Sequence, residues 1–303
     1  MENRFVNYNY RPFRIVRESG TMIRALARQA LKGRWLEAFV LLLAAWAISS
    51  LPSYLAAILD IQWINFITGI YSIVISGPVS LGVSYYFLKL FRQRPAQISD
   101  LRYGFEYFSK ALLLYLSMAI RVFLWSLLFV IPGIVAAFKY SMAPYILADD
   151  PNKSPSQCLM ESTMMMTGNK MNYFLLLLGF IGWAILASIP QSWIGVKAVE
   201  RYNDSYFYFR DPQILVQIIN DTAYSLKGFI ATLPEFFVRV YILVSTACFY
   251  DLANGNLMVG GFNYGPASGS VENPYSGESV PFRDVPPQTA ADSEDSPGEG
   301  GEN

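Results

Sequence analysis

The sequence predicts an all-α protein, a polytopic bundle of about six transmembrane helices with amphipathic helices at the membrane surface. Three observations predict this class. Hydrophobic residues make up 53% of the chain and charged residues only 15%, against about 25% charged residues in an ordinary soluble domain. The uncharged residues gather in runs close to the roughly 20 residues that a helix needs to cross bilayer hydrocarbon. No stretch alternates apolar and polar residues as a soluble core would require.

The charges sum to zero but are unevenly distributed. The first 36 residues are basic, the residues from 254 onward are acidic, and an apolar body separates them. No basic patch is interleaved with aromatic residues, so we expect no nucleic-acid partner. The composition predicts four parts: a basic, polar and poorly ordered segment over 1–19, an amphipathic interfacial helix over 20–36, a transmembrane bundle over 37–252 and a disordered acidic tail over 253–303.

An amphipathic helix precedes the first apolar run. Apolar residues recur at spacings of three and four, while Arg24, Arg28 and Lys32 form a cationic stripe with one turn between neighbours. This pattern predicts a helix on an anionic membrane surface, in which Arg24, Arg28 and Lys32 bind lipid headgroups and Trp35 lies at the headgroup level. The alternative is a helix whose apolar face packs against a partner.

Six apolar runs predict the membrane helices, over 38–59, 64–91, 111–131, 134–148, 171–189 and 233–252. Proline removes a backbone donor and bends a helix, so we expect breaks at Gly77-Pro78 and Pro132-Gly133 and a helix end at Pro190. The fourth run has about 15 residues, few for a crossing. It is either a short crossing or a re-entrant segment.

Two further patterns concern helix ends and helix contacts. Ser154 is well placed as the N-cap of a polar helix, with Pro155 in its first position and Gly168 at its end. Close contacts between helices are expected at four glycines, Gly77, Gly82, Gly179 and Gly182.

The orientation in the cell membrane follows from the distribution of Lys and Arg. These residues gather in the first 36 residues and again over 89–110, which predicts that both regions face the cytoplasm. Six crossings place both termini in the cytoplasm, and five place the acidic tail outside. With six crossings, Cys158 is cytoplasmic and should react with an impermeant maleimide only after cells are opened.

Four stretches carry a resemblance to a known family: GPVSLGVSYYFLKLFR (77–92), PGIVAAFKYSMAPYILADDP (132–151), ESTMMMTGNKMNYFLLLLGFIGWAILA (161–187) and FYDL (249–252). They resemble the bacterial integral membrane proteins called domain of unknown function 975, found mostly in Gram-positive bacteria. The most specific marks include Pro132, Gly133, Tyr140, Ser141, Tyr145, Asp149, Pro151, Ser162, Gly168, Lys170, Gly182 and Trp183. The resemblance implies a six-helix bundle with cytoplasmic termini and no established activity. The chain departs from the family pattern in a longer, more polar segment over 191–232 and in its acidic tail.

Three basic residues lie inside expected membrane helices: Arg121, Lys139 and Arg239. A charge at the bilayer centre costs on the order of 2.5–3.5 kcal/mol on insertion scales and therefore marks a candidate site. We interpret the three as a candidate anion or lipid-headgroup site in the bundle interior, with Ser117, Ser126 and Tyr140 as polar neighbours. The alternative is structural: Arg121 forms a pair, and Lys139 and Arg239 extend to the membrane surface.

Other residue patterns have simpler explanations. Asp149 and Asp150 suit a turn and helix cap before Pro151 better than a proton or cation site. The methionines at 164–166 suit an amphipathic helix better than a soft-metal site. The chain has no His, two Cys and no phosphate loop, nucleophile elbow or paired catalytic carboxylates. We therefore expect no metal, no cofactor and no catalysis.

Three functions remain. The first is a non-catalytic membrane protein that works by association, as an accessory, scaffold, immunity-type or lipid-organising protein. Its partners would be bilayer lipid, with anionic headgroups, and a membrane protein. The second is a transporter or permease component for a small anionic or lipidic solute, suggested by Arg121 and the expected helix breaks. The third is a membrane-embedded enzyme that acts on lipid, for which the sequence offers no catalytic group.

Overall fold

The computed structural model describes residues 13–59, 64–209 and 226–257. The predicted tail from residue 258 and part of the segment over 191–232 lie outside the described residues. Helices make up nearly all of the described chain and no strand occurs within it, which confirms the predicted all-α class. The elements are α1 (Gly20–Leu31), α2 (Trp35–Leu59), α3 (Ile64–Phe91), the 3-10 helix η1 (Ile98–Arg102), α4 (Tyr103–Glu106), α5 (Phe108–Leu128), α6 (Val130–Tyr140), α7 (Ala143–Asp149), α8 (Pro155–Met165), α9 (Lys170–Leu178), α10 (Ile181–Phe209) and α12 (Leu226–Ala253).

The second half of α12 lies at the centre of the fold. Between Val240 and Phe249, six residues have no exposed surface: Val240, Val244, Ser245, Ala247, Cys248 and Phe249. The helix contacts α1, α2, α3 and α10. It ends at Ala253, and two residues later Gly255 has a φ of 76°, the left-handed conformation that glycine adopts readily after a helix C-terminus.

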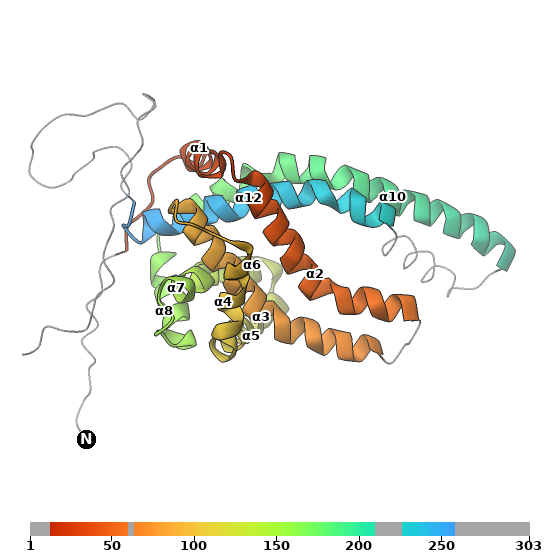
Figure 1. Ribbon diagram of the computed structural model, residues 1–303, viewed down its shortest axis with the longest axis horizontal. Helices are drawn as coiled ribbons and strands as arrows, with labels where there is room; N and C mark the ends of the chain where they lie inside the picture. Colours follow the sequence, from red (N-terminus) through yellow and green to blue (C-terminus); the bar gives the residue numbers. More distant parts are fainter. Residues whose placement is uncertain (1–12, 60–63, 210–225, 258–303) are drawn as a thin grey trace, which may run out of the picture. The chain divides into compact units, whose positions relative to one another are not determined.

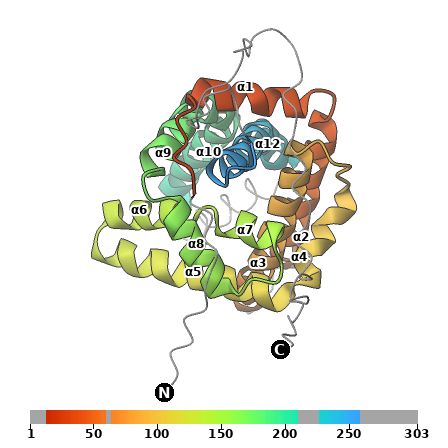
Figure 2. The same cartoon turned by 90° about the vertical axis from the view of Figure 1, so that its left-hand side faces the viewer.

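The helices run in two main directions. Figures 1 and 2 show α10 and α12 alongside each other. Figure 2 views α12 end-on, and in that view α1 and the α5–α6 pair lie crosswise to it. In Figure 1, α1 is seen end-on, near the C-terminal end of α12. A set of crosswise helices therefore lies near one end of the long helices.

Several helices are long and apolar enough to cross a membrane. Among the described residues there are four such segments: Phe66–Phe91, Phe108–Leu128, Val130–Asp149 and Lys227–Ala253. The pair Lys170–Leu178 and Ile181–Lys197, bent by 46°, makes a fifth if it counts as one span. The first expected run lies in α2, whose apolar part Trp35–Ser50 is shorter.

The prolines interrupt the helices less than expected. Pro78 lies inside the uninterrupted α3, and Pro190 lies inside α10 and does not end it. Neighbouring helices can compensate for the lost hydrogen bond of a proline in a membrane helix, which explains both continuations. The expected break at Pro132-Gly133 occurs earlier, at the extended Phe129 (φ −158°, ψ 150°). Pro132 lies in the first turn of α6, where its missing N–H is not needed.

Close helix contacts occur at three of the four predicted glycines. A Cβ on Gly77 would lie 2.7 Å from the Ala111 carbonyl oxygen of α5, and one on Gly82 would overlap the backbone of Leu101 in η1. A Cβ on Gly179 would overlap the guanidinium of Arg24. At Gly182, however, a Cβ would meet nothing within 4 Å, so this part of the prediction is wrong. The exposed position of Gly182 on α10 is the reason.

The end of the basic segment is held in place, contrary to the expectation that all of 1–19 is poorly ordered. Residues 13–19 have no regular structure, but the Arg14 N–H donates to the Ala253 carbonyl (2.8 Å). The Asn169 carboxamide accepts from the Val16 N–H (2.8 Å) and donates to the Arg14 carbonyl (2.9 Å). Val16 is fully buried. This extended segment thus ties the loop before α9 to the end of α12.

Candidate functional site

A buried ion-pair cluster joins the C-terminal ends of three helices. Arg92, directly after α3, donates to Asp251 near the end of α12 and to Asp149, the last residue of α7. Its Nη2 lies 2.7 Å from Asp251 Oδ1 and 3.1 Å from Asp149 Oδ2. The Tyr250 hydroxyl also donates to Asp149 (3.0 Å). The side chain of Asp251 has no exposed surface and that of Arg92 has 9%.

The chemistry of this Arg92 cluster is structural. Burial alone would lower the pKa of Arg92, but the facing carboxylates more than offset it and hold the pKa above its ordinary value. The guanidinium therefore stays charged, and its donors are occupied by the two carboxylates. Three helix C-termini, each with a partial negative charge, meet at this one cation. Asp149 serves in the cluster, while Asp150 caps the next turn by accepting from the Asn152 N–H (3.0 Å).

The three intramembrane basic residues do not form one interior site. Arg121 is exposed on α5 and Arg239 is exposed on α12. Arg121 and Lys139 do converge, because both lie against the ring of Tyr140, at 5.9 Å and 5.4 Å from its centroid. The described helices therefore do not enclose Arg121 in the way that the expected interior site would require. Of the two expected helix breaks that suggested a transporter, the one in α3 does not occur and the other occurs at Phe129.

The apolar face of α1 packs against the bundle itself. Ile23, Ala27 and Leu31 are buried, and α1 contacts α12, α9 and α3. The protein's own helices therefore cover this face, which is neither the predicted membrane surface nor the packing on a partner that the sequence left open. The helix also ends earlier than predicted: Gly33 (φ 79°) makes a turn, and Trp35 begins α2. Arg28 and Lys32 remain exposed.

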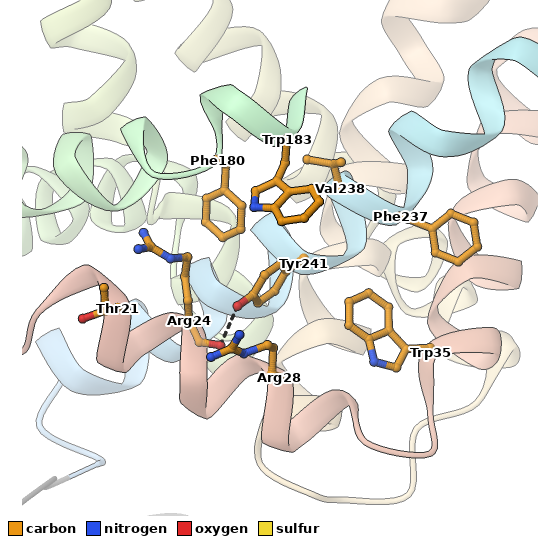
Figure 3. A pocket seen from close by; sticks show the side chains of 9 residues that line it. All are labelled: Thr21, Arg24, Arg28, Trp35, Phe180, Trp183, Phe237, Val238 and Tyr241. Carbon is orange, nitrogen blue, oxygen red and sulfur yellow. Dashed lines mark hydrogen bonds between the residues drawn. The ribbon is translucent and has the colours of Figure 1, made fainter. Parts of the chain in front are cut away.

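A cavity of about 630 Å³ lies where α1 meets α10 and α12. Figure 3 shows its walls: cationic side chains from α1 on one side, and aromatic side chains from the other helices around them. The lining residues are Thr21, Arg24, Arg28, Trp35, Phe180, Trp183, Phe237, Val238 and Tyr241. Arg24 and Arg28 are thus the two residues of the predicted cationic stripe that line the cavity, and Lys32 does not.

Aromatic packing fixes the position of Arg24. The Tyr241 hydroxyl donates to the Arg24 carbonyl (2.8 Å), which ties α1 to α12 (Figure 3). The Phe180 ring packs edge-to-face on Tyr241 at 4.9 Å between centroids and carries the Arg24 guanidinium over its face at 5.8 Å. Gly179, at the bend between α9 and α10, leaves the space that this guanidinium occupies.

The charge of the cavity is positive. Arg24 and Arg28 lie one helical turn apart, so their Cβ atoms are separated by about 5–6 Å. None of the lining residues is acidic. Planar guanidinium groups match the oxygens of phosphate and carboxylate groups, and the remaining walls offer apolar contact. The arrangement therefore suits an anion that carries an apolar group.

Comparison with known proteins gives a family and no activity. The family model described as "Protein of unknown function (DUF975)" matches residues 19–137 and 127–255. The chain belongs to the DUF975 family. No curated protein and no solved structure matches it. The two matched ranges include α1, the cavity and the Arg92 cluster.

The marks of the DUF975 resemblance hold the helices together at several points. Ser162 on α8 accepts from the Met142 N–H (3.2 Å) and donates to the Lys139 carbonyl (2.9 Å), which bridges the gap between α6 and α7. Tyr145 donates to the Leu243 carbonyl (3.3 Å), and the Pro151 carbonyl accepts from Lys110. Ser141 bonds locally to Phe138, Gly168 has a φ of 83°, and Lys170 begins α9. Trp183, 62% exposed, lines the cavity.

Two other predicted features of this DUF975 protein lie around α8. The Ser154 cap with Pro155 is confirmed, and α8 ends at Met165, three residues before Gly168. Met165 and Met166 are buried core side chains. Cys158 is fully buried, and burial together with Glu161 raises the pKa of its thiol to about 12. It is therefore a poor probe of topology, because an impermeant maleimide reacts with exposed thiolate.

Neither the pairing of Arg92 with Asp251 nor the aromatic wall of the cavity was predicted from the sequence. A signal for the pair was present, because Arg92 is the last residue of one stretch that resembles the DUF975 family and Asp251 lies in another, at 249–252. Opposite charges at the ends of two apolar helices indicate a contact. No such signal existed for the cavity, whose residues come from four separate parts of the chain.

Proposed function

We propose that this DUF975 protein is a non-catalytic membrane protein that binds anionic phospholipid where α1 meets α10 and α12. Its role is then one of association, as a lipid-organising or accessory protein. The observation that supports this most is the cavity itself, in which Arg24 and Arg28 face aromatic and aliphatic side chains. A phospholipid has the matching division into an anionic headgroup and apolar chains.

The apolar surface that continues from the cavity favours a lipid over a free anion. Along α10, beyond Trp183, the exposed apolar side chains include Leu186, Ile189 and Trp193. At about 1.5 Å per residue, Trp183 to Trp193 covers about 15 Å, half of the hydrocarbon core of about 30 Å. An acyl chain bound at the cavity would therefore have an apolar path along α10 as deep as one leaflet. A free phosphate or carboxylate would use none of it.

The clustering of basic regions supports a cytoplasmic position for this end of the protein. Arg34, between α1 and α2, donates to the carbonyls of Arg94 (3.3 Å) and Ala96 (3.4 Å). The basic start of the chain and the basic stretch over 89–110 thus lie together, as one cytoplasmic face would require. In this orientation the cavity takes lipid from the cytoplasmic leaflet, where anionic headgroups attract basic segments.

Native mass spectrometry of the full chain tests this proposal. The protein is reconstituted in nanodiscs of phosphatidylcholine and phosphatidylglycerol and then released for mass measurement. We expect a retained phosphatidylglycerol on the parent protein, and its loss from the Arg24→Gln/Arg28→Gln variant, because both guanidinium partners of the phosphate are gone.

A matched control uses the third residue of the stripe. Lys32→Gln removes the same charge as Arg28→Gln from the same side of α1, but Lys32 does not line the cavity. Lys32→Gln should retain the lipid, and Arg28→Gln should weaken retention. Equal retention of phosphatidylglycerol by all variants would exclude this site. If Lys32→Gln lost as much lipid as Arg28→Gln, the loss would reflect the positive charge of the surface and not the cavity.

A further inference from the structure

Helices α5 and α6 form a hairpin whose outer part contains no charged residue. The uncharged stretch runs from Val122 to Phe138 and turns at Phe129, whose extended backbone separates the two helices. The two legs touch closely, since a Cβ on Gly133 would overlap the Ser126 side chain. This contact keeps the stretch folded back on itself.

The apolar side chains at the end of the hairpin are exposed on both legs and at the turn. Leu127, Val130 and Ile131 are 73%, 72% and 74% exposed. Phe123, Leu128 and Phe129 are exposed too. A contiguous apolar surface of this kind is not stable in water. Bilayer hydrocarbon would cover all of these side chains together.

Basic residues mark the base of both legs. Arg121 precedes the uncharged stretch on α5 and Lys139 follows it on α6, and both lie against the ring of Tyr140. The two charges are thus at the same level of the hairpin. Long basic side chains with an aromatic ring are typical of the membrane–water interface.

The length of the two legs between the basic residues and the turn determines how deep the hairpin can reach into the bilayer. Arg121 is eight residues from the turn at Phe129, which is about 12 Å of helix, and the leg from Val130 to Lys139 is about 14 Å. The hydrocarbon core is about 30 Å thick. A hairpin with both basic residues at one interface therefore ends inside the nearer leaflet.

The direction of the hairpin agrees with this. Length and composition alone would allow Phe108–Leu128 and Val130–Asp149 to cross. Yet in Figure 2 the α5–α6 pair lies crosswise to α12, which is viewed end-on. If α12 crosses the bilayer, a hairpin crosswise to it can enter the hydrocarbon only obliquely, so neither leg crosses and the turn stays within the nearer leaflet.

We infer that the α5–α6 hairpin is inserted in one leaflet of the bilayer, with Arg121 and Lys139 at the headgroups and the turn at Phe129 in the acyl chains. Both legs then begin and end on the same side of the membrane. The fourth predicted span is re-entrant, paired with the third. This assignment does not depend on the lipid cavity, which lies on other helices.

Single introduced cysteines test the assignment. Val130→Cys places a thiol at the exposed turn, while Ser109→Cys and Asn152→Cys, both exposed positions, report on the two bases. Each variant in cells is treated with an impermeant maleimide before and after opening the membrane. We expect the two base positions to react from one and the same side, and Val130→Cys to react from neither.

Two results would overturn the inference. Reaction of Val130→Cys from the side opposite to Ser109→Cys and Asn152→Cys would show two crossings. Reaction from their own side would show a hairpin in water. Spin labelling of Val130→Cys in nanodiscs separates insertion from burial or misfolding: an inserted turn is relaxed strongly by oxygen and weakly by a water-soluble nickel chelate, and the opposite ratio would also contradict the inference.

Discussion

Replacing Arg92 by methionine is expected to lower the free energy of unfolding by about 3–5 kcal/mol, because it leaves the buried carboxylate of Asp251 without its cation. Asp251 has no exposed surface, and Asp149 faces the same guanidinium. Methionine has similar length but can neither neutralise nor hydrogen-bond the two groups. Unfolding of the purified protein in mild detergent, followed by intrinsic tryptophan fluorescence, measures the change.

Two comparisons show whether the loss arises from the cluster. Arg94→Met removes the same kind of charge two residues further on, where the side chain is exposed, and should change stability by less than about 0.5 kcal/mol. Arg92→Lys should restore little, since an ammonium group cannot present the donors of a guanidinium to two carboxylates. If Arg92→Met is as stable as Arg94→Met, the cluster does not hold the helix ends together.

Gly104→Ala is expected to be the most damaging methyl addition among the described glycines. A Cβ at this position would overlap the Pro78 carbonyl oxygen and lie 2.7 Å from its carbon. Both atoms are backbone, so α3 and α4 must separate to admit the methyl group. Overpacking of this kind costs about 1–3 kcal/mol, which thermal unfolding in detergent would detect.

Gly195→Ala is the matched control for Gly104→Ala. Gly195 lies inside α10, and a Cβ there would meet nothing within 4 Å. Alanine in an open helical position should raise stability by about 0.5–1 kcal/mol. If Gly104→Ala does not lower the stability relative to Gly195→Ala, α3 and α4 do not approach as closely as described.

Helices were predictable from the sequence because long apolar runs have few alternatives to helix in a bilayer. The run over 64–91 coincides with α3, and the Ser154 cap begins α8 as expected. Helix ends were less predictable where proline was the signal. Pro78 and Pro190 lie within helices, and the break expected at Pro132 falls at Phe129. Packing by neighbouring helices decides whether a helix continues through a proline, and this packing cannot be predicted from the sequence pattern alone.

The candidate site was predictable in part. The cationic stripe of Arg24, Arg28 and Lys32 follows from helical spacing, and two of its members line the cavity. The apolar face of α1, however, packs on α12, because the bundle leaves a matching surface near the C-terminal end of α12. Arg121, Lys139 and Arg239 all stood out as charges in apolar helices, but only their tertiary positions show that Tyr140 brings two of them together.

The measurement that tests the central claim most directly is photo-crosslinking with an anionic phospholipid that carries a diazirine in the upper part of one acyl chain. Mass spectrometry of peptides then maps where the lipid is bound on the full chain in nanodiscs. We expect crosslinks concentrated around Trp183 on α10 and Phe237 on α12, and their loss in Arg24→Gln/Arg28→Gln. Crosslinks spread evenly over the exposed apolar helices, or unchanged in that variant, would contradict it.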